Sequence, residues 1–244
     1  MSALSSLFKQ IKPNRPLTCS AIIAAAGTSQ RCKGEDKLFS TINGIPAIAY
    51  SIGVFEKCEF VRDIVIVSRR ERIEDIAEIC RKSNFDKVSK VMVGGATRHD
   101  SVLNGIYAAS PKSELIAIHD AARPCIDIDI VNKAIIAAGK YHAAAPAIAV
   151  TSTLKRVSNN IISETIDRDG LFEIQTPQVF RAEIIKAALT NAKKKEFNIT
   201  DDCMAAEQIG VPVHIVEGSG RNIKITVKED LDIAELIIKG YDLK

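Results

Sequence analysis

Residues 19–37 read CSAIIAAAGTSQRCKGEDK, an apolar run followed directly by a loop of small residues that carries Gly27, Arg31 and Lys37. The run at residues 19–23 predicts a buried strand. Alanine and glycine let backbone N–H groups approach anionic oxygens closely, while Arg31 and Lys37 add positive charge. The stretch therefore predicts a phosphate-holding turn at the end of a first strand, a feature typical of α/β sheets.

The loop matches neither of the two common phosphate-binding motifs. The dinucleotide motif needs three glycines, and Ser29 and Cys32 stand at the second and third places. The nucleoside-triphosphatase motif needs Gly-Lys-Ser or Gly-Lys-Thr, and the chain contains neither. A strand-to-helix turn of small residues is also common as plain structure, so both interpretations of the loop stay open at this point.

Strand-like apolar runs and segments of helical spacing alternate along the following residues. We expect strands at residues 64–67, 87–93, 115–118 and 143–150, and helices at residues 47–58, 73–83, 99–109 and 128–141. This alternation is typical of a mostly parallel, twisted sheet with helices on both faces, a Rossmann-like α/β fold. Ligands bind such sheets beyond the carboxyl ends of the strands, so the polar loops should gather at one edge.

Composition narrows the function classes. Of 244 residues 46% are hydrophobic, which allows a sizeable core, and the net charge is only +3. Lys and Arg are spread along the chain, which favours small anionic ligands over nucleic acid. No apolar run approaches the length of a membrane span. The six cysteines form no Cys-x-x-Cys pair, which predicts reduced thiols in a cytoplasmic protein, with neither a zinc site nor a disulfide framework.

The first residues differ from the rest of the chain. Residues 1–18 hold three basic residues, three serines and no acidic residue, as an organelle address does. The segment is short for an address and is interrupted by Pro13 and Pro16, which favours a flexible lead-in. We therefore expect a single domain over residues 19–240.

Two further loops follow expected strands. Gly94 and Gly95 open the first, where Ser101 either caps a helix or lies beside free N–H groups that face a ligand. The second holds Asp120 at the end of a strand, which suits magnesium because this ion takes one or two carboxylates plus phosphate oxygens. The alternatives for Asp120 are a helix cap or a partner for Arg123. We assign no catalytic role to the neighbouring His119.

The alternation breaks after residue 150. Residues 151–157 and 161–166 predict a β-hairpin, part of an arm at about residues 151–171. A hairpin that leaves the body is marginal alone, so we expect it to pack on a second subunit in a homodimer. A last strand pair is expected at residues 213–217 and 222–226. Lys224 alternates there with two isoleucines and would point to the opposite face, which favours a site role.

An ordered set of short motifs resembles the 2-C-methyl-D-erythritol 4-phosphate cytidylyltransferase family of the non-mevalonate isoprenoid pathway. The motifs are A-A-A-G…R…K at residues 24–37, D-S-V-x-x-G at 100–105, H-D-A-A-R-P at 119–124, T-x-D-R-x-G-L at 165–171, T-P-Q-x-F at 176–180, I-T-D-D at 199–202 and N-I-K-I-T at 222–226. Each motif alone is weak, but the ordered set is specific. The similarity runs from about residue 20 to residue 238.

The resemblance implies a nucleotidyltransferase-type fold and a CTP-dependent enzyme. Such an enzyme transfers CMP from CTP to 2-C-methyl-D-erythritol 4-phosphate and releases pyrophosphate, with Mg²⁺ or another divalent cation as cofactor. The attacking phosphate is a dianion near neutral pH and needs no general base. Catalysis would then consist of positioning and charge neutralisation. This agrees with the sequence, in which we find no Ser-His-Asp or paired-carboxylate arrangement.

The resemblance also implies residue roles. Arg31 and Lys37 would hold the triphosphate, Lys224 would stabilise charge at the α-phosphorus, and Asp120 would bind the metal. The implied CTP-binding residues are Ala25, Ala26, Gly27, Gly94 and Ser101. The implied substrate-binding residues are Asp120, Arg123, Thr153, Arg168 and Thr200. Thr153 and Arg168 would enter the partner's site from the arm.

The chain departs from the family pattern at Ser29, where a second glycine is common, and at Asp36, where a proline is common. Asp36 would weaken CTP binding if its carboxylate pointed inward. Ribitol-5-phosphate cytidylyltransferases, which share the loop and the CTP chemistry, and a nucleotide-binding protein without turnover are the alternatives. A nicotinamide dehydrogenase fits poorly, because Ser68 and Arg69 stand where an acidic residue should end the second strand.

Overall fold

The structure is a computed structural model that describes residues 17–27 and 36–242. Residues 1–16 of the lead-in expected at residues 1–18 lie outside the described residues, as do Ser29, Arg31 and Cys32. In the described part of the chain, no helix combines the length and the apolar character needed to cross a membrane.

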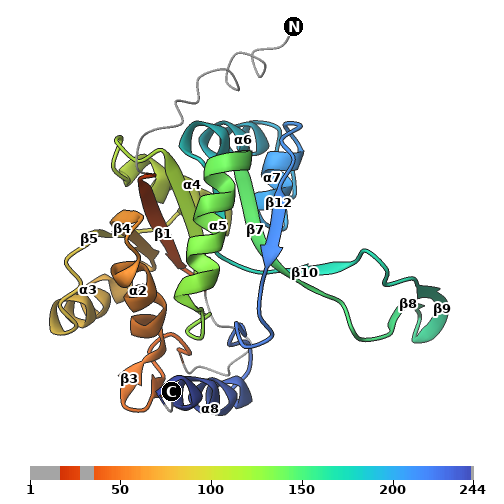
Figure 1. The fold of residues 1–244 in the computed structure, drawn as a ribbon, viewed down its shortest axis with the longest axis horizontal. Coiled ribbons are helices and arrows are strands. Elements are labelled where there is room, and N and C mark those ends of the chain that lie inside the picture. Colours follow the sequence, from red (N-terminus) through yellow and green to blue (C-terminus); the bar gives the residue numbers. More distant parts are fainter. Residues whose placement is uncertain (1–16, 28–35, 243–244) are drawn as a thin grey trace, which may run out of the picture.

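A single mixed sheet forms the centre of the fold (Figure 1). Its strand order is β10-β7-β11-β6-β1-β4-β5, and β12 also pairs with β7. Strands β1, β4, β5 and β6 run parallel, whereas β11 is antiparallel to both β6 and β7. The strands are β1 (Cys19–Ala25), β4 (Val61–Ser68), β5 (Val88–Val93), β6 (Leu115–Asp120), β7 (Ala143–Ala149), β10 (Phe172–Ile174), β11 (Gln178–Arg181) and β12 (His214–Glu217). The predicted mostly parallel α/β sheet is confirmed.

Helices cover both faces of the sheet, because successive side chains of the buried strands point to opposite sides. Ile23 of β1 belongs to the core under α2, α3 and α5, while its neighbour Ile22 belongs to the core under α4, α6 and α7. A smaller apolar cluster joins α8 to the hairpin of β2 and β3. These elements are β2 (Thr41–Ile42), β3 (Ile45–Pro46), α2 (Ala47–Lys57), η2 (Arg70–Arg72), α3 (Ile73–Lys82), α4 (Arg98–Ala108), α5 (Ile128–Tyr141), α6 (Ala182–Lys194), α7 (Asp202–Glu207) and α8 (Glu229–Asp242).

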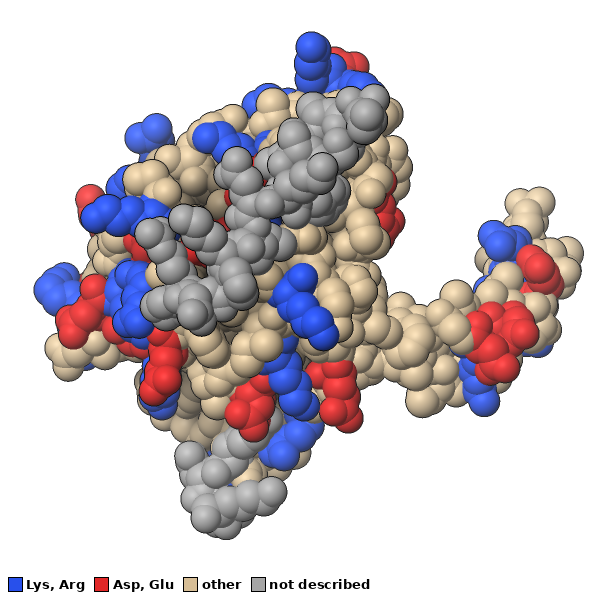
Figure 2. Space-filling view, turned by 45° about the horizontal axis from the view of Figure 1, so that its top comes forward, with Lys and Arg blue, Asp and Glu red and all other residues tan. Residues whose placement is uncertain are grey.

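The predicted hairpin is present and stands away from the body (Figure 1). It consists of β8 (Leu154–Ser158) and β9 (Ile161–Ile166), and it turns at Asn159 and Asn160, which both have positive φ as a tight two-residue turn requires. Its apolar side chains Val157, Ile161 and Ile162 are exposed. On the face shown in Figure 2, basic and acidic residues are interspersed over both the body and this arm.

The expected last strand at residues 222–226 is wrong, because β12 is the last strand of the sheet and residues 222–226 are irregular. Within residues 17–27 and 36–242, no strand pairs with this segment. It is attached instead by isolated hydrogen bonds, such as that from Ile225 N to Ala122 O at 2.8 Å. Alternating apolar residues indicated an extended segment correctly, but pairing depends on a neighbour that a local pattern does not reveal. Lys224 was predicted to point away from the neighbouring isoleucines, and this is confirmed for Ile225, which is buried while Lys224 is exposed.

The described cysteines are all free and buried: Cys19, Cys58, Cys80, Cys125 and Cys203. Burial raises the pKa of the Cys80 and Cys125 thiols to about 11, which keeps them protonated and unreactive at neutral pH. In residues 17–27 and 36–242 the described thiols are unpaired, and their reduced state stays a prediction.

Candidate active site

A cleft of about 410 Å³ lies beyond the carboxyl ends of the adjacent parallel strands β1 and β6. The chain proceeds from β1 to β4 on one side and returns with β6 on the other, which makes this the topological switch point of the sheet. The cleft is lined by Ala24, Ala26, Gly27, Lys37, Leu38, Gly95, Ala96, Thr97, Arg98, Ser101, Asp120, Ala122 and Lys224. The predicted gathering of polar loops at one edge is thus confirmed.

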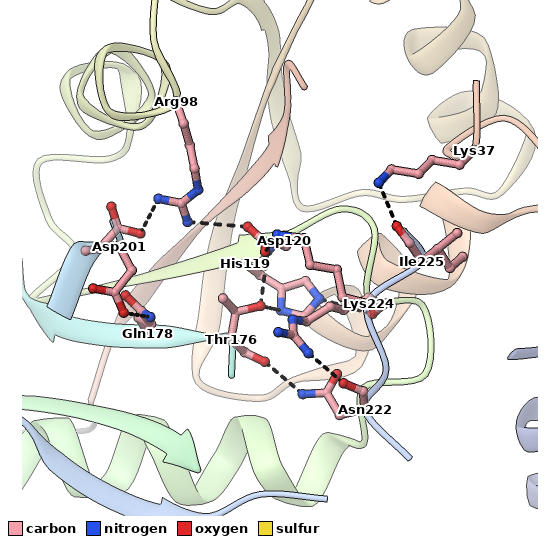
Figure 3. Close-up of polar contacts among 12 residues, drawn as sticks. Lys37, Arg98, His119, Asp120, Thr176, Gln178, Asp201, Asn222, Lys224 and Ile225 are labelled. Atoms are coloured by element: carbon pink, nitrogen blue, oxygen red, sulfur yellow. Dashed lines mark hydrogen bonds and ion pairs between the residues drawn. The ribbon is translucent and has the colours of Figure 1, made fainter. Parts of the chain in front are cut away.

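The loop after β1 supplies small residues and one lysine to this cleft. Ala26 and Gly27 line it, whereas Ala25 is buried and accepts a 3.3 Å hydrogen bond at its carbonyl from Ser68 Oγ. Lys37 crosses the opening and donates from Nζ to the carbonyl of Ile225 at 2.6 Å (Figure 3). Arg31 lies outside the described residues, so its role stays a prediction.

The opposite wall is the N-terminus of α4. Thr97, not Ser101, caps this helix, because Thr97 Oγ1 accepts from Asp100 N at 3.1 Å. Ser101 lies in the first turn, where its Oγ accepts from Gly95 N at 2.9 Å and donates to Thr97 O at 2.8 Å. The cap alternative for Ser101 is therefore wrong: its hydroxyl braces the loop and leaves the start of the helix facing the cleft, a suitable place for anionic oxygens.

The glycines of this loop are required by close packing. A Cβ atom on Gly94 would lie 2.5 Å from Ser101 Oγ, and one on Gly95 would lie 2.2 Å from Asp100 Cβ. Gly94 lies behind the cleft surface, whereas Gly95 lines it. The two glycines were expected to open space in this loop, and the structure shows that they allow the chain to pack closely; Gly94 supports the wall and is not among the lining residues.

Asp120 lies at the centre of the site, at the end of β6 (Figure 3). Its Oδ2 lies 2.6 Å from Lys224 Nζ, and its Oδ1 lies 3.3 Å from Arg98 Nη2. Burial alone would raise the pKa of this carboxyl, but Arg98 and Lys224 hold it well below its usual range. Asp120 is therefore an anion at neutral pH.

The alternative in which Asp120 pairs with Arg123 is wrong. The side chain of Arg123 turns away and donates from Nη1 to the carbonyl of Asn222 at 2.7 Å. Arg123 is near the site, but it is not among the residues that line the cleft. It holds the irregular segment that carries Lys224.

That segment is fixed mainly by Asn222, which is buried. Its Nδ2 donates to Gln175 Oε1 and to the carbonyl of Thr176, both at 3.1 Å (Figure 3). Ile225 N also donates to the carbonyl of Ala122 in the loop after β6. These contacts take the place of the hydrogen bonds that a neighbouring strand would have supplied. Lys224 is thereby held over Asp120 without a sheet neighbour.

Arg98 is a site residue that the sequence did not reveal. It is the first residue of α4 and lines the cleft, and its Nη1 also lies 2.9 Å from Oδ2 of the fully buried Asp202. The only local signal is a basic residue directly after a helix cap. Its two partners are distant in sequence, so no spacing rule finds them.

Asp36 does not enter the cleft. Its carboxylate pairs with Arg69 and, at 3.1 Å, with Arg72, and its side chain is almost fully buried between them. Because these two arginines pair with the Asp36 carboxylate, its negative charge does not oppose Lys37 in the cleft.

The remaining predicted residues lie outside the cleft. Thr153 and Arg168 belong to the exposed arm, where Arg168 Nη1 donates to the carbonyl of Thr151. Thr200 is exposed and directly precedes Asp201, which caps α7. Within one chain, the described residues thus assemble Ala26, Gly27, Lys37, Ser101, Asp120 and Lys224, and they leave the arm residues apart.

One carboxylate in the described cleft could hold a metal ion. Among residues 17–27 and 36–242, no cluster of three or more His, Cys, Asp or Glu side chains is present. Asp120 alone fits a magnesium ion that takes its other oxygens from a bound triphosphate and water. Both Asp120 oxygens already contact cations, so metal binding would displace Lys224 or Arg98 from one of them.

These features define a class of protein. A parallel sheet whose switch point holds small residues, a helix N-terminus and converging cations binds nucleotides and other phosphorylated ligands. In the described cleft we find no hydroxyl or thiol activated by an adjacent histidine. Group transfer through positioning and charge is the chemistry that suits such a site.

Comparison with known proteins specifies the family. The model of the 2-C-methyl-D-erythritol 4-phosphate cytidylyltransferase family matches residues 19–240. An enzyme of that name from Caldanaerobacter subterraneus subsp. tengcongensis is 41% identical over 226 residues, covering 91% of this chain and 100% of the relative. One from Clostridium botulinum strain Langeland is 39% identical over 222 residues, covering 90% and 97%. The chain therefore belongs to this family of cytidylyltransferases, and the resemblance found in the sequence is confirmed.

Solved structures agree with this assignment. The 4-diphosphocytidyl-2C-methyl-D-erythritol synthase of Anaerococcus prevotii has a TM-score of 0.80 at 28% identity, covering 92% of this chain and 97% of that chain. The 2-C-methyl-D-erythritol 4-phosphate cytidylyltransferase of Thermus thermophilus has a TM-score of 0.76 at 26% identity, covering 90% and 98%.

Proposed function

We propose that this chain transfers CMP from CTP to 2-C-methyl-D-erythritol 4-phosphate, giving 4-diphosphocytidyl-2-C-methyl-D-erythritol and pyrophosphate for isoprenoid synthesis. Membership of the family supports the proposal. The observation that carries it is one cleft, beside the N-terminus of α4, in which Arg98 and Lys224 contact the carboxylate of Asp120 and Lys37 adds a third cation to the lining. This arrangement suits a polyphosphate whose terminal part must leave.

The residues present account for the chemistry in the following way. An oxygen of the substrate phosphate attacks the α-phosphorus of CTP, and the bond from that phosphorus to the bridging oxygen of pyrophosphate breaks. The attacking oxygen is already anionic, so the site needs no general base. Lys224 neutralises the charge that grows at the α-phosphorus, and Lys37 holds the leaving pyrophosphate. The small residues Ala26 and Gly27 leave room for the nucleotide to approach the backbone.

A divalent cation, most simply Mg²⁺, belongs to this proposal. When bound, it would neutralise triphosphate charge, with Asp120 as its protein ligand. Arg31 would add a further cation from the loop after β1. The compartment that we propose is the cytoplasm, in keeping with the free, buried thiols.

The arm supplies the rest of the proposed site. Thr153 and Arg168 lie on the arm, away from the cleft of their own subunit, and the apolar side chains Val157, Ile161 and Ile162 are exposed on it. We infer that two chains exchange arms in a homodimer. In this arrangement Thr153 and Arg168 contact the polyol phosphate in the cleft of the partner, while Thr200 contacts it from the home subunit.

The test is a pyrophosphate-release assay with purified protein, CTP and magnesium. Methylerythritol phosphate and ribitol 5-phosphate are supplied in separate reactions. We expect pyrophosphate to be released much faster with methylerythritol phosphate than with ribitol 5-phosphate. Preference for ribitol 5-phosphate would overturn the substrate, and no release with either would overturn the proposed activity in favour of a nucleotide-binding protein without turnover.

A further inference from the structure

Asp202 is a fully buried carboxylate to which the proposed reaction assigns no role. It is the first residue of α7, outside the cleft lining, and its side chain has no exposed surface. Burial raises its pKa, against the opposing effect of the Arg98 guanidinium 2.9 Å away. A buried charge is costly to keep unless it is paired, so its position behind the active site calls for an explanation.

Arg98 connects Asp202 to the cleft. Nη1 of its guanidinium lies 2.9 Å from Asp202 Oδ2, and Nη2 lies 3.3 Å from Asp120 Oδ1. The guanidinium is planar and rigid, so a contact that fixes one nitrogen also orients the other. The remaining oxygen of Asp120 lies 2.6 Å from Lys224 Nζ. Four charged groups therefore form a continuous chain from α7 to the cleft.

The far end of this chain is firmly anchored. Gln178 of β11 is buried, donates from Nε2 to Asp201 Oδ2 at 2.8 Å, and accepts at Oε1 from Cys203 N at 2.9 Å. These contacts, the first of which is drawn in Figure 3, hold the residues on both sides of Asp202 against the sheet. Asp202 is thus a fixed point to which Arg98 is tied.

We propose that Asp202 is a positioning residue for the transfer reaction: acting through Arg98, it holds the Asp120 carboxylate with one oxygen against Lys224. The inference rests on the proposed function. Without Asp202, both nitrogens of Arg98 are free to pair with the two oxygens of Asp120, because bidentate pairing is the favoured geometry of these groups. Asp120 would then turn away from Lys224, and both residues would leave the places that the reaction needs.

The first variant is Asp202→Asn, which keeps the size of the side chain and removes its charge. The matched control is Asp63→Asn, another buried carboxylate, located near the amino end of β4. Asp63 accepts hydrogen bonds from Ser20 Oγ at 2.9 Å and Ser110 N at 2.8 Å and does not line the cleft. Both variants remove a buried charge, but only one should disturb Asp120.

We expect Asp202→Asn to lower kcat by about 10-fold to 100-fold, because small misplacements of reacting groups are costly, while the KM for CTP stays within about 3-fold. Asp63→Asn should lower the melting temperature but leave kcat near that of the wild type. A kcat of Asp202→Asn within about 2-fold of wild type would overturn the inference.

A double-mutant cycle with Asp120→Asn separates positioning from general stability. If Asp202 acts through Asp120, adding Asp202→Asn to Asp120→Asn should cost little further activity, whereas Asp63→Asn should cost the same factor in both backgrounds. Independent, multiplying effects of Asp202→Asn and Asp120→Asn would overturn the inference. If Asp202→Asn does not fold, Arg98→Lys replaces it in the cycle, because a lysine offers one nitrogen and does not bridge both carboxylates in the same way.

A crystal structure of Asp202→Asn tests the same point without activity. The contact between Lys224 Nζ and Asp120 Oδ2 should be lost, and its persistence would overturn the inference. If the wild-type protein releases no pyrophosphate with either polyol phosphate, the proposed function fails, and this structural comparison still decides the positioning role.

Discussion

Lys224 Nζ lies 2.6 Å from Asp120 Oδ2 and joins two segments that are 104 residues apart in the sequence. The contact is made across the cleft opening by an irregular segment, so its geometry depends on the hydrogen bonds of Asn222 and Ile225 and not on a sheet ladder. The pairing also keeps Asp120 ionised and Lys224 directed toward the cleft. A phosphorylated ligand that enters would compete with Asp120 for the same ammonium group.

The first prediction concerns Lys224→Ala. The variant removes a charge that the proposed reaction needs mostly in the transition state, so kcat should fall by a factor on the order of 100 or more while the Kd for CTP changes much less. Steady-state kinetics and equilibrium titration of CTP measure the two quantities. If the affinity for CTP fell by the same factor as kcat, Lys224 would only bind the ground state.

Lys133→Ala provides the control for Lys224→Ala. Lys133 is an exposed lysine of α5 whose partner at 3.4 Å is Glu217, and it does not line the cleft. Exposed ion pairs contribute little to stability, so both kcat and the melting temperature should stay close to those of the wild type.

The second prediction compares two glycines on opposite walls of the cleft. A Cβ on Gly95 would overlap Asp100, whereas a Cβ on Gly27 would meet no described atom within 4 Å. Gly95→Ala should therefore lower the melting temperature, and Gly27→Ala should leave it unchanged but weaken CTP binding by filling space in the cleft. Thermal unfolding and CTP titration distinguish these effects. Unchanged CTP affinity in Gly27→Ala would show that the nucleotide does not approach this wall.

The sequence revealed those parts of the site that depend on local order. Small residues after a first strand and an acid at the end of a later strand predict a cleft at the carboxyl edge, and in the structure Gly27 and Asp120 both line that cleft. The positive charge of the first loop added Lys37 and the alternation at residues 222–226 added Lys224, and the ordered motifs implied their roles. Each of these predictions needs only local sequence.

The parts that the sequence missed depend on contacts between distant segments. Arg98 lies between Asp120 and Asp202, and neither contact follows from a spacing along the chain. The strand expected at residues 222–226 failed for the same reason, because alternation does not show whether a neighbour is available. The side chain of Asp36 was equally unpredictable until Arg69 and Arg72 were located.

The third prediction concerns Asn222→Ala. This change removes two buried hydrogen bonds and leaves Gln175 Oε1 and the carbonyl of Thr176 without this donor. The free energy of unfolding should fall by about 1–3 kcal/mol, and kcat should fall because Lys224 loses its support. Urea unfolding and steady-state kinetics measure both. A loss of stability with an unchanged kcat would show that Lys224 is held adequately by Ile225 and its neighbours.

The fourth prediction tests arm exchange. Arg168→Ala disables the arm contribution and Lys224→Ala disables the home contribution, so each variant alone should have low activity. After subunit exchange, a mixed dimer contains one cleft with both residues intact, and part of the activity should return. Dimer exchange is followed with differently tagged chains. Proven exchange without recovery would show that Arg168 acts within its own subunit.

The last prediction concerns the stability of the fold as a function of pH and depends on His119. Its ring is fully buried; Nδ1 lies 3.0 Å from Thr176 Oγ1 and Nε2 lies 3.2 Å from the carbonyl of Arg123. Burial lowers the pKa of His119 to about 4, against the opposing effect of the neighbouring Asp120. The folded chain therefore keeps this ring neutral at a pH where the unfolded chain protonates it.

The sign of the pH effect follows from this difference in proton binding. Between pH 6.5 and pH 4, His119 is protonated in the unfolded chain but not in the folded chain. The contribution of His119 to the free energy of unfolding is therefore fully present above pH 6.5, and it is lost as the pH drops toward 4. For His119 alone the loss amounts to about 3 kcal/mol. Asp120, whose pKa is lowered, contributes stability that is present above the ordinary aspartate pKa and is lost mainly as the pH falls below about 4, so it adds little to this window.

His119→Gln isolates the contribution, because glutamine is neutral and polar but does not titrate. The variant should lose less stability than the wild type between pH 6.5 and pH 4.5 in urea unfolding, whatever its stability at pH 8. Burial also lowers the pKa of His99 and His142, so the slope should decrease without vanishing. Identical slopes for the two proteins would mean that His119 becomes protonated within the folded chain without cost.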